Sequence, residues 1–218
     1  SVLMLCIINL IGFIALFYSF SYMSKYTSES NYYALFCLLV AGMNGVVLSG
    51  DLFNLTVFLE VSVISSYALV AFGVGKTELE ASFKYQVLGG LAIMLILLGL
   101  GVIFWKSKTL NIADVKQVMS AGTDKAFYVF VQVLLLTGFG LKAAIIPFHA
   151  WLPDAHSSAP SPISAMLSGV LIKAVGIYVL IRLFFNMFEF SQEIAVTITV
   201  LGVLSMVIGS LVALIQWD

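Results

Sequence analysis

The amino-acid sequence predicts an all-α, polytopic membrane protein. Hydrophobic residues make up 61% of the 218 residues, charged residues make up only 10%, and the mean hydropathy is +1.10. A soluble domain has about 45–50% apolar and about 25% charged residues. Apolar runs of the length that spans a bilayer, about 20 residues, recur along the chain, and no segment keeps the strict alternation of a membrane strand. We therefore expect a single transmembrane domain over residues 1–218.

The apolar runs predict about seven membrane-spanning helices, separated by short polar turns. Asp51 is placed to cap the third helix, and Ser161 with Pro162 is placed to open the sixth. Between the fourth and fifth helices, the polar segment 106–125 has its apolar residues on one side of a short surface helix. The expected spans are Val2–Met23, Tyr32–Leu48, Leu52–Phe72, Ala81–Trp105, Ala126–Phe148, Ile163–Phe184 and Ile194–Trp217.

Three ionisable residues, Glu60, Lys142 and Lys173, lie deep inside these predicted helices. At about 1.5 Å per residue they lie roughly 12, 9 and 16 Å from a helix end, in a hydrocarbon core about 30 Å thick. Charges at this depth are costly, and they cluster in a bundle interior where they pair or line a hydrated path. A structural ion pair between Glu60 and Lys142 would leave Lys173 without an acid. Because desolvation favours the neutral form of an unpartnered lysine, we expect a proton or ion path.

A proline and two histidines follow Lys142. Pro147 has no N–H, so the carbonyl of Ala143 loses its helical partner, and we expect the fifth helix to be broken there. Broken helices are tolerated at membrane depth where they line a cavity, although a simple packing kink explains the proline as well. If the helix continues past the kink, His149 lies on nearly the same face as Lys142. His149 and His156 are either proton relays near neutral pH or interfacial residues with satisfied hydrogen bonds.

Three further residues are ranked as accessory. Lys84 lies near a helix end and can extend its ammonium to the membrane interface. Tyr67 follows Glu60 by seven residues and faces the same way, although packing also explains it. Asp154 lies between the two histidines, but this spacing matches no recognised ligand pattern, so no metal site is expected. The net charge of −1 gives no indication of nucleic acid binding.

Two long blocks of the sequence are distinctive: GDLFNLTVFLEVSVISSYALVAFG, residues 50–73, and GFGLKAAIIPFHAWLPDAHSSAPSPISAMLSGVLIKAVGIYVLIR, residues 138–182. They resemble the antiporter-like subunits of respiratory complex I, the Mrp-type sodium/proton antiporters and the membrane-bound hydrogenases. The GDLFN opening is closest to the Mrp D-type and hydrogenase branch. The resemblance implies about fourteen helices in two inverted five-helix repeats. This chain would cover the first repeat, residues 31–184, and the first helix of a truncated second repeat, residues 194–217.

The resemblance also implies roles for individual residues. Glu60 and Lys142 would form a coupled acid–base pair, Lys173 would be the central lysine of a proton path, and His149 and His156 would lie on a histidine-bearing connection. No cofactor is expected in this chain, so the redox chemistry of a quinone reductase or hydrogenase would take place in other subunits.

The leading hypothesis is a proton- or sodium/proton-translocating subunit. We expect it in a prokaryotic cell membrane, among the other membrane subunits of a respiratory-type or antiporter complex. The alternatives are a purely structural membrane subunit and a stand-alone secondary transporter for a small solute.

Overall fold

The computed structural model describes residues 1–26, 28–121, 125–188 and 192–215, and within these residues it is built from helices without a strand. This confirms the predicted fold class. The elements are α1 (Val2–Tyr22), η1 (Met23–Lys25), α2 (Glu29–Leu48), α3 (Leu52–Val70), α4 (Lys76–Ser107), α5 (Ile112–Ala121), α6 (Lys125–Lys142), α7 (Trp151–Ser158), α8 (Ser161–Met166), η2 (Leu167–Tyr178), α9 (Val179–Asn186) and α10 (Gln192–Ile215).

Six helices in the described part of the chain are long and apolar enough to cross a membrane, and Ala126–Lys142 forms a shorter apolar helix. They correspond to the seven expected spans. The second and fourth helices begin earlier than predicted, at Glu29 and Lys76, because acidic residues such as Glu29 and Glu78 suit the first turn of a helix. Trp217, where the last helix was expected to end, lies outside the described residues.

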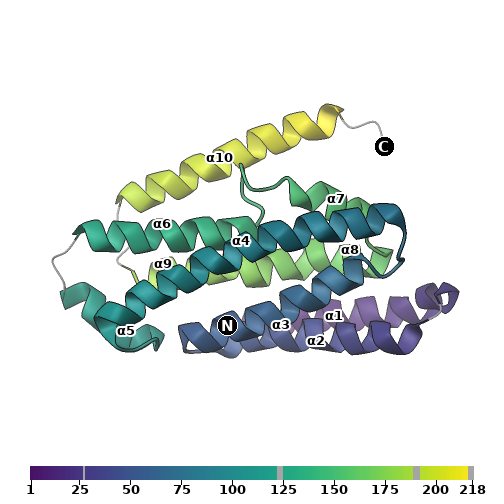
Figure 1. The fold of residues 1–218 in the computed structure, drawn as a ribbon, viewed down its shortest axis with the longest axis horizontal. Coiled ribbons are helices and arrows are strands. Elements are labelled where there is room, and N and C mark those ends of the chain that lie inside the picture. The colour runs from purple at the N-terminus through teal and green to yellow at the C-terminus, as the bar shows by residue number, and fades with distance from the viewer. Residues whose placement is uncertain (27, 122–124, 189–191, 216–218) are drawn as a thin grey trace.

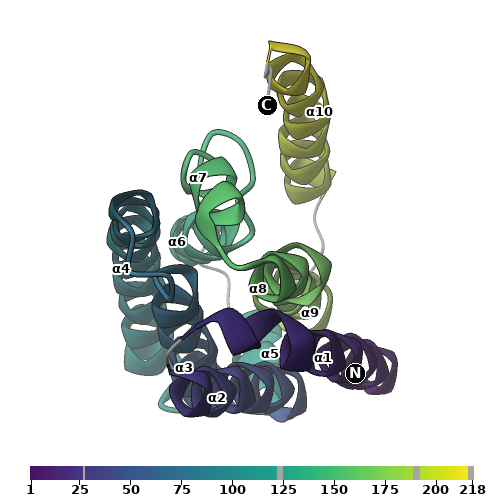
Figure 2. The ribbon, with the colours of Figure 1, turned by 90° about the vertical axis from the view of Figure 1, so that its right-hand side faces the viewer.

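The long helices run side by side, and α10 stands apart from the rest (Figures 1 and 2). Helices α8, η2 and α9 follow one another as a rod in the centre, with α1 and α2 on one side and α6 on the other. None of the residues described in α10 is buried, although the hydroxyl of Ser205 accepts a hydrogen bond of 3.1 Å from the backbone N–H of Ile146. The core of the fold therefore lies within α1–α9.

Two glycines let α2 pack directly on the backbone of α3. A Cβ atom at Gly42 would lie 2.6 Å from the Ser62 nitrogen, and one at Gly45 would overlap the ring of Phe58. Residues 60 and 67 lie on the opposite side of α3 from residues 58 and 62, because successive residues turn by about 100°. The close α2 contact therefore turns Glu60 and Tyr67 toward the rest of the bundle.

The start of α3 is fixed by its cap and by α5. Asp51 accepts hydrogen bonds from the backbone N–H groups of Phe53 and Asn54, at 2.9 and 3.0 Å, which confirms the predicted cap. Leu52 N–H donates to the Leu110 carbonyl, and Ile112 N–H donates to the Gly50 carbonyl. The predicted surface helix is present as α5, with its apolar side buried against the bundle at Ile112, Val115 and Met119.

The expected break in the fifth span is present, but it is wider than a kink. Helix α6 ends at Lys142, residues 143–150 are not helical, and α7 begins at Trp151. Ala144 has a φ of 52°, in the left-handed region where an α-helix cannot continue. Pro147 has no N–H to bond the carbonyl of Ala143, and its ring clashes with the preceding helical turn. The helix therefore ends before the proline instead of continuing with a bend. The condition under which Lys142 and His149 would share a helix face, a helix that continues past the kink, is therefore not met.

The sixth span begins at Ser161, two residues before the predicted Ile163. Pro160 occupies the cap position, Ser161 is already helical, and Pro162 lies in the first turn. Ser161 is therefore not the cap. The middle of this span, η2, is a π-helix, a form that is rare and often marks functional sites. Lys173 lies within it.

Candidate functional site

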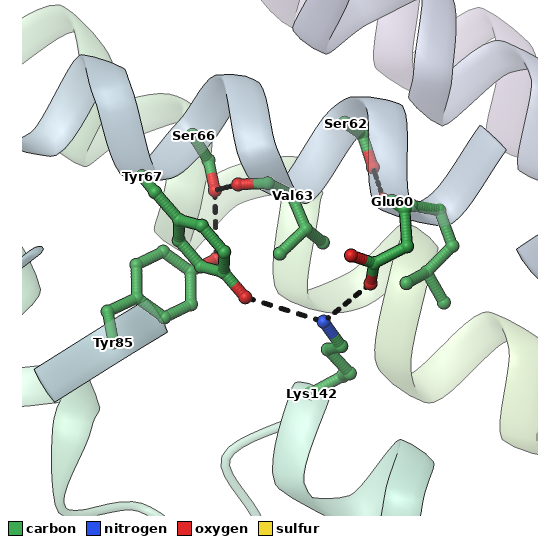
Figure 3. A network of polar contacts seen from close by, with 8 residues as sticks. Glu60, Ser62, Val63, Ser66, Tyr67, Tyr85 and Lys142 are labelled. Carbon is green, nitrogen blue, oxygen red and sulfur yellow. Dashed lines mark hydrogen bonds and ion pairs between the residues drawn. The ribbon is translucent and has the colours of Figure 1, made fainter. Parts of the chain in front are cut away.

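The centre of the candidate site is an ion pair between Glu60 of α3 and Lys142, the last residue of α6. Lys142 Nζ lies 3.2 Å from Glu60 Oε1 (Figure 3). The side chain of Lys142 is 2% exposed, and that of Glu60 is 27% exposed. A lysine this deeply enclosed needs an acidic partner, since an isolated buried ammonium is strongly disfavoured. The structure places these two side chains in contact, and their role as a coupled acid–base pair stays a prediction.

The broken end of α6 is held by residues from two other elements. Trp151 of α7 donates from Nε1 to the carbonyl of Leu141 at 3.1 Å, which satisfies one of the carbonyls that a helix end leaves free. Gly176 of η2 lets Ala143 approach closely, because a Cβ atom at Gly176 would lie 2.5 Å from that of Ala143. These contacts fix the backbone on both sides of Lys142.

Tyr67 is the third member of the site. Its hydroxyl oxygen lies 3.5 Å from Lys142 Nζ, on the other side of the ammonium from Glu60 (Figure 3). The ring of Tyr67 packs edge-on against Tyr85 of α4, with the ring centres 4.4 Å apart. Tyr85 accepts a hydrogen bond from Ser66 and stacks on Trp151 at 4.2 Å.

Sequence reasoning had named Tyr67 but missed Ser66, Tyr85 and Trp151. These three residues pack around Tyr67 and have no hydrogen bond to Lys142 or Glu60 among the described residues. No spacing in the sequence indicates them, because their positions depend on how α3, α4 and α7 pack together.

Lys84 and Asp154 form a second ion pair, which joins α4 to α7. Lys84 Nζ lies 2.8 Å from Asp154 Oδ2 and 2.9 Å from Glu80 Oε1. The side chains of Lys84 and Asp154 are 48% and 44% exposed. Exposed pairs of this kind contribute little stability. The structure thus brings two of the three accessory residues together at the surface, in contrast to the enclosed Lys142.

The two histidines lie in different surroundings. His149 is half-buried in the non-helical connection, and its Nδ1 atom is buried without a hydrogen-bond partner among the described residues. His156 of α7 is also half-buried, and its Nδ1 atom lies 2.9 Å from Ser164 Oγ. Burial, and then the positive charge of Lys173, lower the pKa of His156, so this side chain is neutral at pH 7.

Lys173 and Pro147 lie away from the ion pair. Lys173 is exposed, and its ammonium donates to the carbonyl of Ser168 on the same π-helical stretch. Pro147 is exposed within the break. Among the described residues, no hydrogen bond or ion pair joins Lys173 to Glu60 or Lys142, and no three His, Cys, Asp or Glu side chains lie together as metal ligands would. The predicted role of Lys173 as a central lysine stays a prediction.

Comparison with known proteins places this arrangement in a family. Residues 49–218 match the transmembrane domain of the NADH:quinone oxidoreductase/Mrp antiporter family. The chain belongs to this family. The match includes both sequence blocks that suggested the resemblance and all the candidate site residues, and it identifies the chain as part of a multi-pass integral membrane protein.

Individual relatives come from both branches of the family. The chain is 35% identical to the N subunit of NADH-quinone oxidoreductase from Desulforudis audaxviator and 34% identical to the D-type subunit of the Na(+)/H(+) antiporter from Alkalihalophilus pseudofirmus. Each match covers 99% of this chain and 44% of the relative, so the chain spans less than half the length of these proteins.

A solved structure resembles the fold closely. It is the membrane-bound sulfane sulfur reductase, an archaeal respiratory membrane complex, with a TM-score of 0.80, 31% identity, and coverage of 89% of this chain and 39% of the other.

Proposed function

We propose that this chain is the proton-translocating part of an antiporter-like subunit, in which Glu60 and Lys142 form the working acid–base pair. Family membership supports the class of function, since relatives include one component of a Na(+)/H(+) antiporter and one of NADH-quinone oxidoreductase. The observation that carries the proposal is the ion pair of 3.2 Å between the deeply enclosed Lys142 and the more open Glu60. Charged pairs at membrane depth mark ion and proton paths.

The geometry suggests how the pair works. While Glu60 is ionised, its charge stabilises the ammonium of Lys142. When Glu60 takes up a proton or is drawn away, Lys142 loses that stabilisation and gives up its own proton more readily. The break that follows Lys142 interrupts the helix, and His149 within it has a buried Nδ1 atom without a hydrogen-bond partner among the described residues, as expected of a cavity lining rather than of a continuous helix.

Lys173 and His156 extend the proposal. Both belong to the elements that follow the break, and Lys173 lies in a π-helical stretch of the central rod. We assign Lys173 the role of the next proton site and His156 the role of a relay beside it. Residues 31–184 would form the first repeat of the family fold, and residues 194–217 would begin the second.

The proposed subunit works with neighbours. The relatives are subunits of larger membrane assemblies, and this chain covers less than half their length. We therefore assign it partners among the membrane subunits of a respiratory or antiporter complex, which would complete the path across the bilayer and supply any redox reaction. Protons are the proposed ion, and sodium is the second candidate because of the antiporter relatives.

The test is transport by the complete complex in inside-out membrane vesicles, followed with a pH-sensitive dye. Glu60→Gln and Lys142→Ala are expected to lower the initial rate at least about tenfold, the factor that corresponds to about 1.4 kcal/mol. Matched controls are Glu80→Gln and Lys116→Ala, which neutralise an exposed acid and an exposed base outside the site. Replacing sodium with potassium in the buffer separates proton from sodium/proton transport.

The alternatives give different results in the same experiment. A purely structural subunit predicts that Glu60→Gln and Lys142→Ala reduce the amount of assembled complex while the transport rate per complex is unchanged. A stand-alone transporter predicts that the chain moves a solute after it is purified away from its partners. Either result overturns the proposal.

A further inference from the structure

Tyr67 is the second residue that reaches the Lys142 ammonium. Its hydroxyl oxygen lies 3.5 Å from Lys142 Nζ, whereas Glu60 Oε1 lies 3.2 Å from the same atom. Glu60 and Tyr67 are two turns apart on α3, and they approach the ammonium from opposite sides (Figure 3). Since an N–H···O bond normally measures about 2.7–3.2 Å, the ammonium is bonded to Glu60 and held only loosely by Tyr67.

The position of the Tyr67 hydroxyl is set by its surroundings. The residue is only 8% exposed, and its ring is held edge-on against Tyr85. On α4, Gly89 leaves the space that the hydroxyl occupies, because a Cβ atom at residue 89 would overlap the hydroxyl oxygen. Within the described part of the chain, Lys142 is the one hydrogen-bond partner of this hydroxyl. A hydroxyl enclosed in this way is positioned for Lys142 and not for bulk water.

A tyrosine hydroxyl and a carboxylate offer a lysine different chemistry. An ionised carboxylate only accepts hydrogen bonds, whereas a tyrosine hydroxyl both accepts and donates. Tyr67 can therefore accept from the Lys142 ammonium, and it can donate to the neutral amine that remains when Lys142 gives up its proton. Ionised Glu60 can accept a hydrogen bond from either form, but it has no proton to donate to the lone pair of the neutral amine.

Resting on the proposed function, the geometry points to Tyr67 as a positioning residue that hydrogen-bonds Lys142 whenever the Glu60 contact is lost. The hydroxyl holds the ammonium while Glu60 is neutral, and it holds the amine while Lys142 is neutral. Tyr67 keeps its own proton in both states, so the transferred proton is carried by Lys142 and its acidic partners alone. Lys142 thus stays beside α3 between steps instead of turning away from Glu60.

The test compares Tyr67→Phe with Tyr85→Phe in the complete complex. Each change removes one hydroxyl and keeps the aromatic ring, but the Tyr85 hydroxyl contacts Ser66 and not Lys142. We expect Tyr67→Phe to slow transport by about three- to tenfold, as for a weak hydrogen bond to a charged group. Tyr85→Phe is expected to stay within about twofold of the original rate. Yields of assembled complex are measured for both variants.

A second comparison separates positioning from packing. Glu60→Asp withdraws the carboxylate by one methylene, so Lys142 depends more on Tyr67. Combined with Tyr67→Phe, it is expected to slow transport about threefold more than the product of the two single effects, because residues that share a partner are not independent. Combined with Tyr85→Phe, the effects should simply multiply.

The outcomes for the two proposals are distinct. If Glu60→Gln transports normally, the proposed function itself is wrong. If Glu60→Gln is impaired but Tyr67→Phe behaves like Tyr85→Phe, only the role of Tyr67 is wrong. The inference is supported if Glu60→Asp combined with Tyr67→Phe slows transport by more than the product of the two single effects, while Glu60→Asp combined with Tyr85→Phe does not.

Discussion

Removing one partner of the Glu60–Lys142 pair leaves the other charge without its counter-charge. The decrease in the free energy of unfolding should differ between the two variants. At 3.2 Å the attraction is about 5 kcal/mol with an effective dielectric constant of about 20. This decrease is limited, because the remaining charged residue can become neutral by losing a proton (lysine) or gaining one (glutamate). At pH 7 this costs about 4.6 kcal/mol for an ordinary lysine and about 3.7 kcal/mol for an ordinary glutamate.

Glu60→Gln is the more damaging change. It keeps the shape of the side chain but leaves a lysine that is only 2% exposed without its acidic partner. The contact of 3.5 Å between the ammonium and the Tyr67 hydroxyl remains. We expect the free energy of unfolding to fall by about 3 kcal/mol, the lower end of the range for breaking a buried pair. Lys142→Met fills the same space with an apolar chain and strands the more open Glu60, so we expect a loss of about 1–2 kcal/mol.

The double variant decides whether the reasoning is correct. With both charges removed, no ion remains to be desolvated, so Glu60→Gln combined with Lys142→Met should recover most of the stability lost in Glu60→Gln alone. Thermal unfolding of the assembled complex in detergent measures this, at about 2–4 °C per kcal/mol for a chain of this length. The reasoning is refuted if Lys142→Met lowers the free energy of unfolding as much as Glu60→Gln or more. It is also refuted if the double variant is no more stable than Glu60→Gln.

Three further predictions concern stability and use the same thermal assay. Asp51→Ala should lower the free energy of unfolding by about 1 kcal/mol, because two N–H groups of α3 lose their cap, and Asp51→Asn should restore most of it. Gly42→Ala should cost about 1–3 kcal/mol, because the new methyl group would lie 2.6 Å from the Ser62 nitrogen; Gly90→Ala, with open space around it, is the control. Lys84→Ala should leave the unfolding temperature nearly unchanged, since its pair with Asp154 is exposed, and a clear decrease would mean that α7 depends on it.

Much of the fold follows from composition and local signals. Apolar runs of spanning length correspond to the helices, because backbone groups in a membrane must be bonded within the segment. The Asp51 cap is a local feature of three residues and was predicted correctly. The sequence also predicted a pair of Glu60 with Lys142, and their side chains lie 3.2 Å apart, while the role of the pair stays a prediction.

The extent of the break in the fifth span was not predicted, because neighbouring elements decide it. Helix α6 ends a full turn before Pro147, and the connection is held by Trp151 and by Ala143 against Gly176, so Lys142 and His149 do not lie on one continuous helix. A proline predicts that a helix is interrupted, but how far the interruption extends depends on which side chains satisfy the released carbonyls.

The sequence by itself therefore determined the membrane-spanning, all-helical class and the family, and it predicted the charged pair. Hydrophobic length and the cost of buried charge act within single segments, so they can be recognised without knowing the neighbours. The tertiary structure alone decided that Tyr67 reaches Lys142, that Gly89 makes room for it, and that Lys84 binds Asp154 at the surface. These contacts join residues far apart in the chain, and only the packing of α3, α4, α6 and α7 brings them within reach of one another.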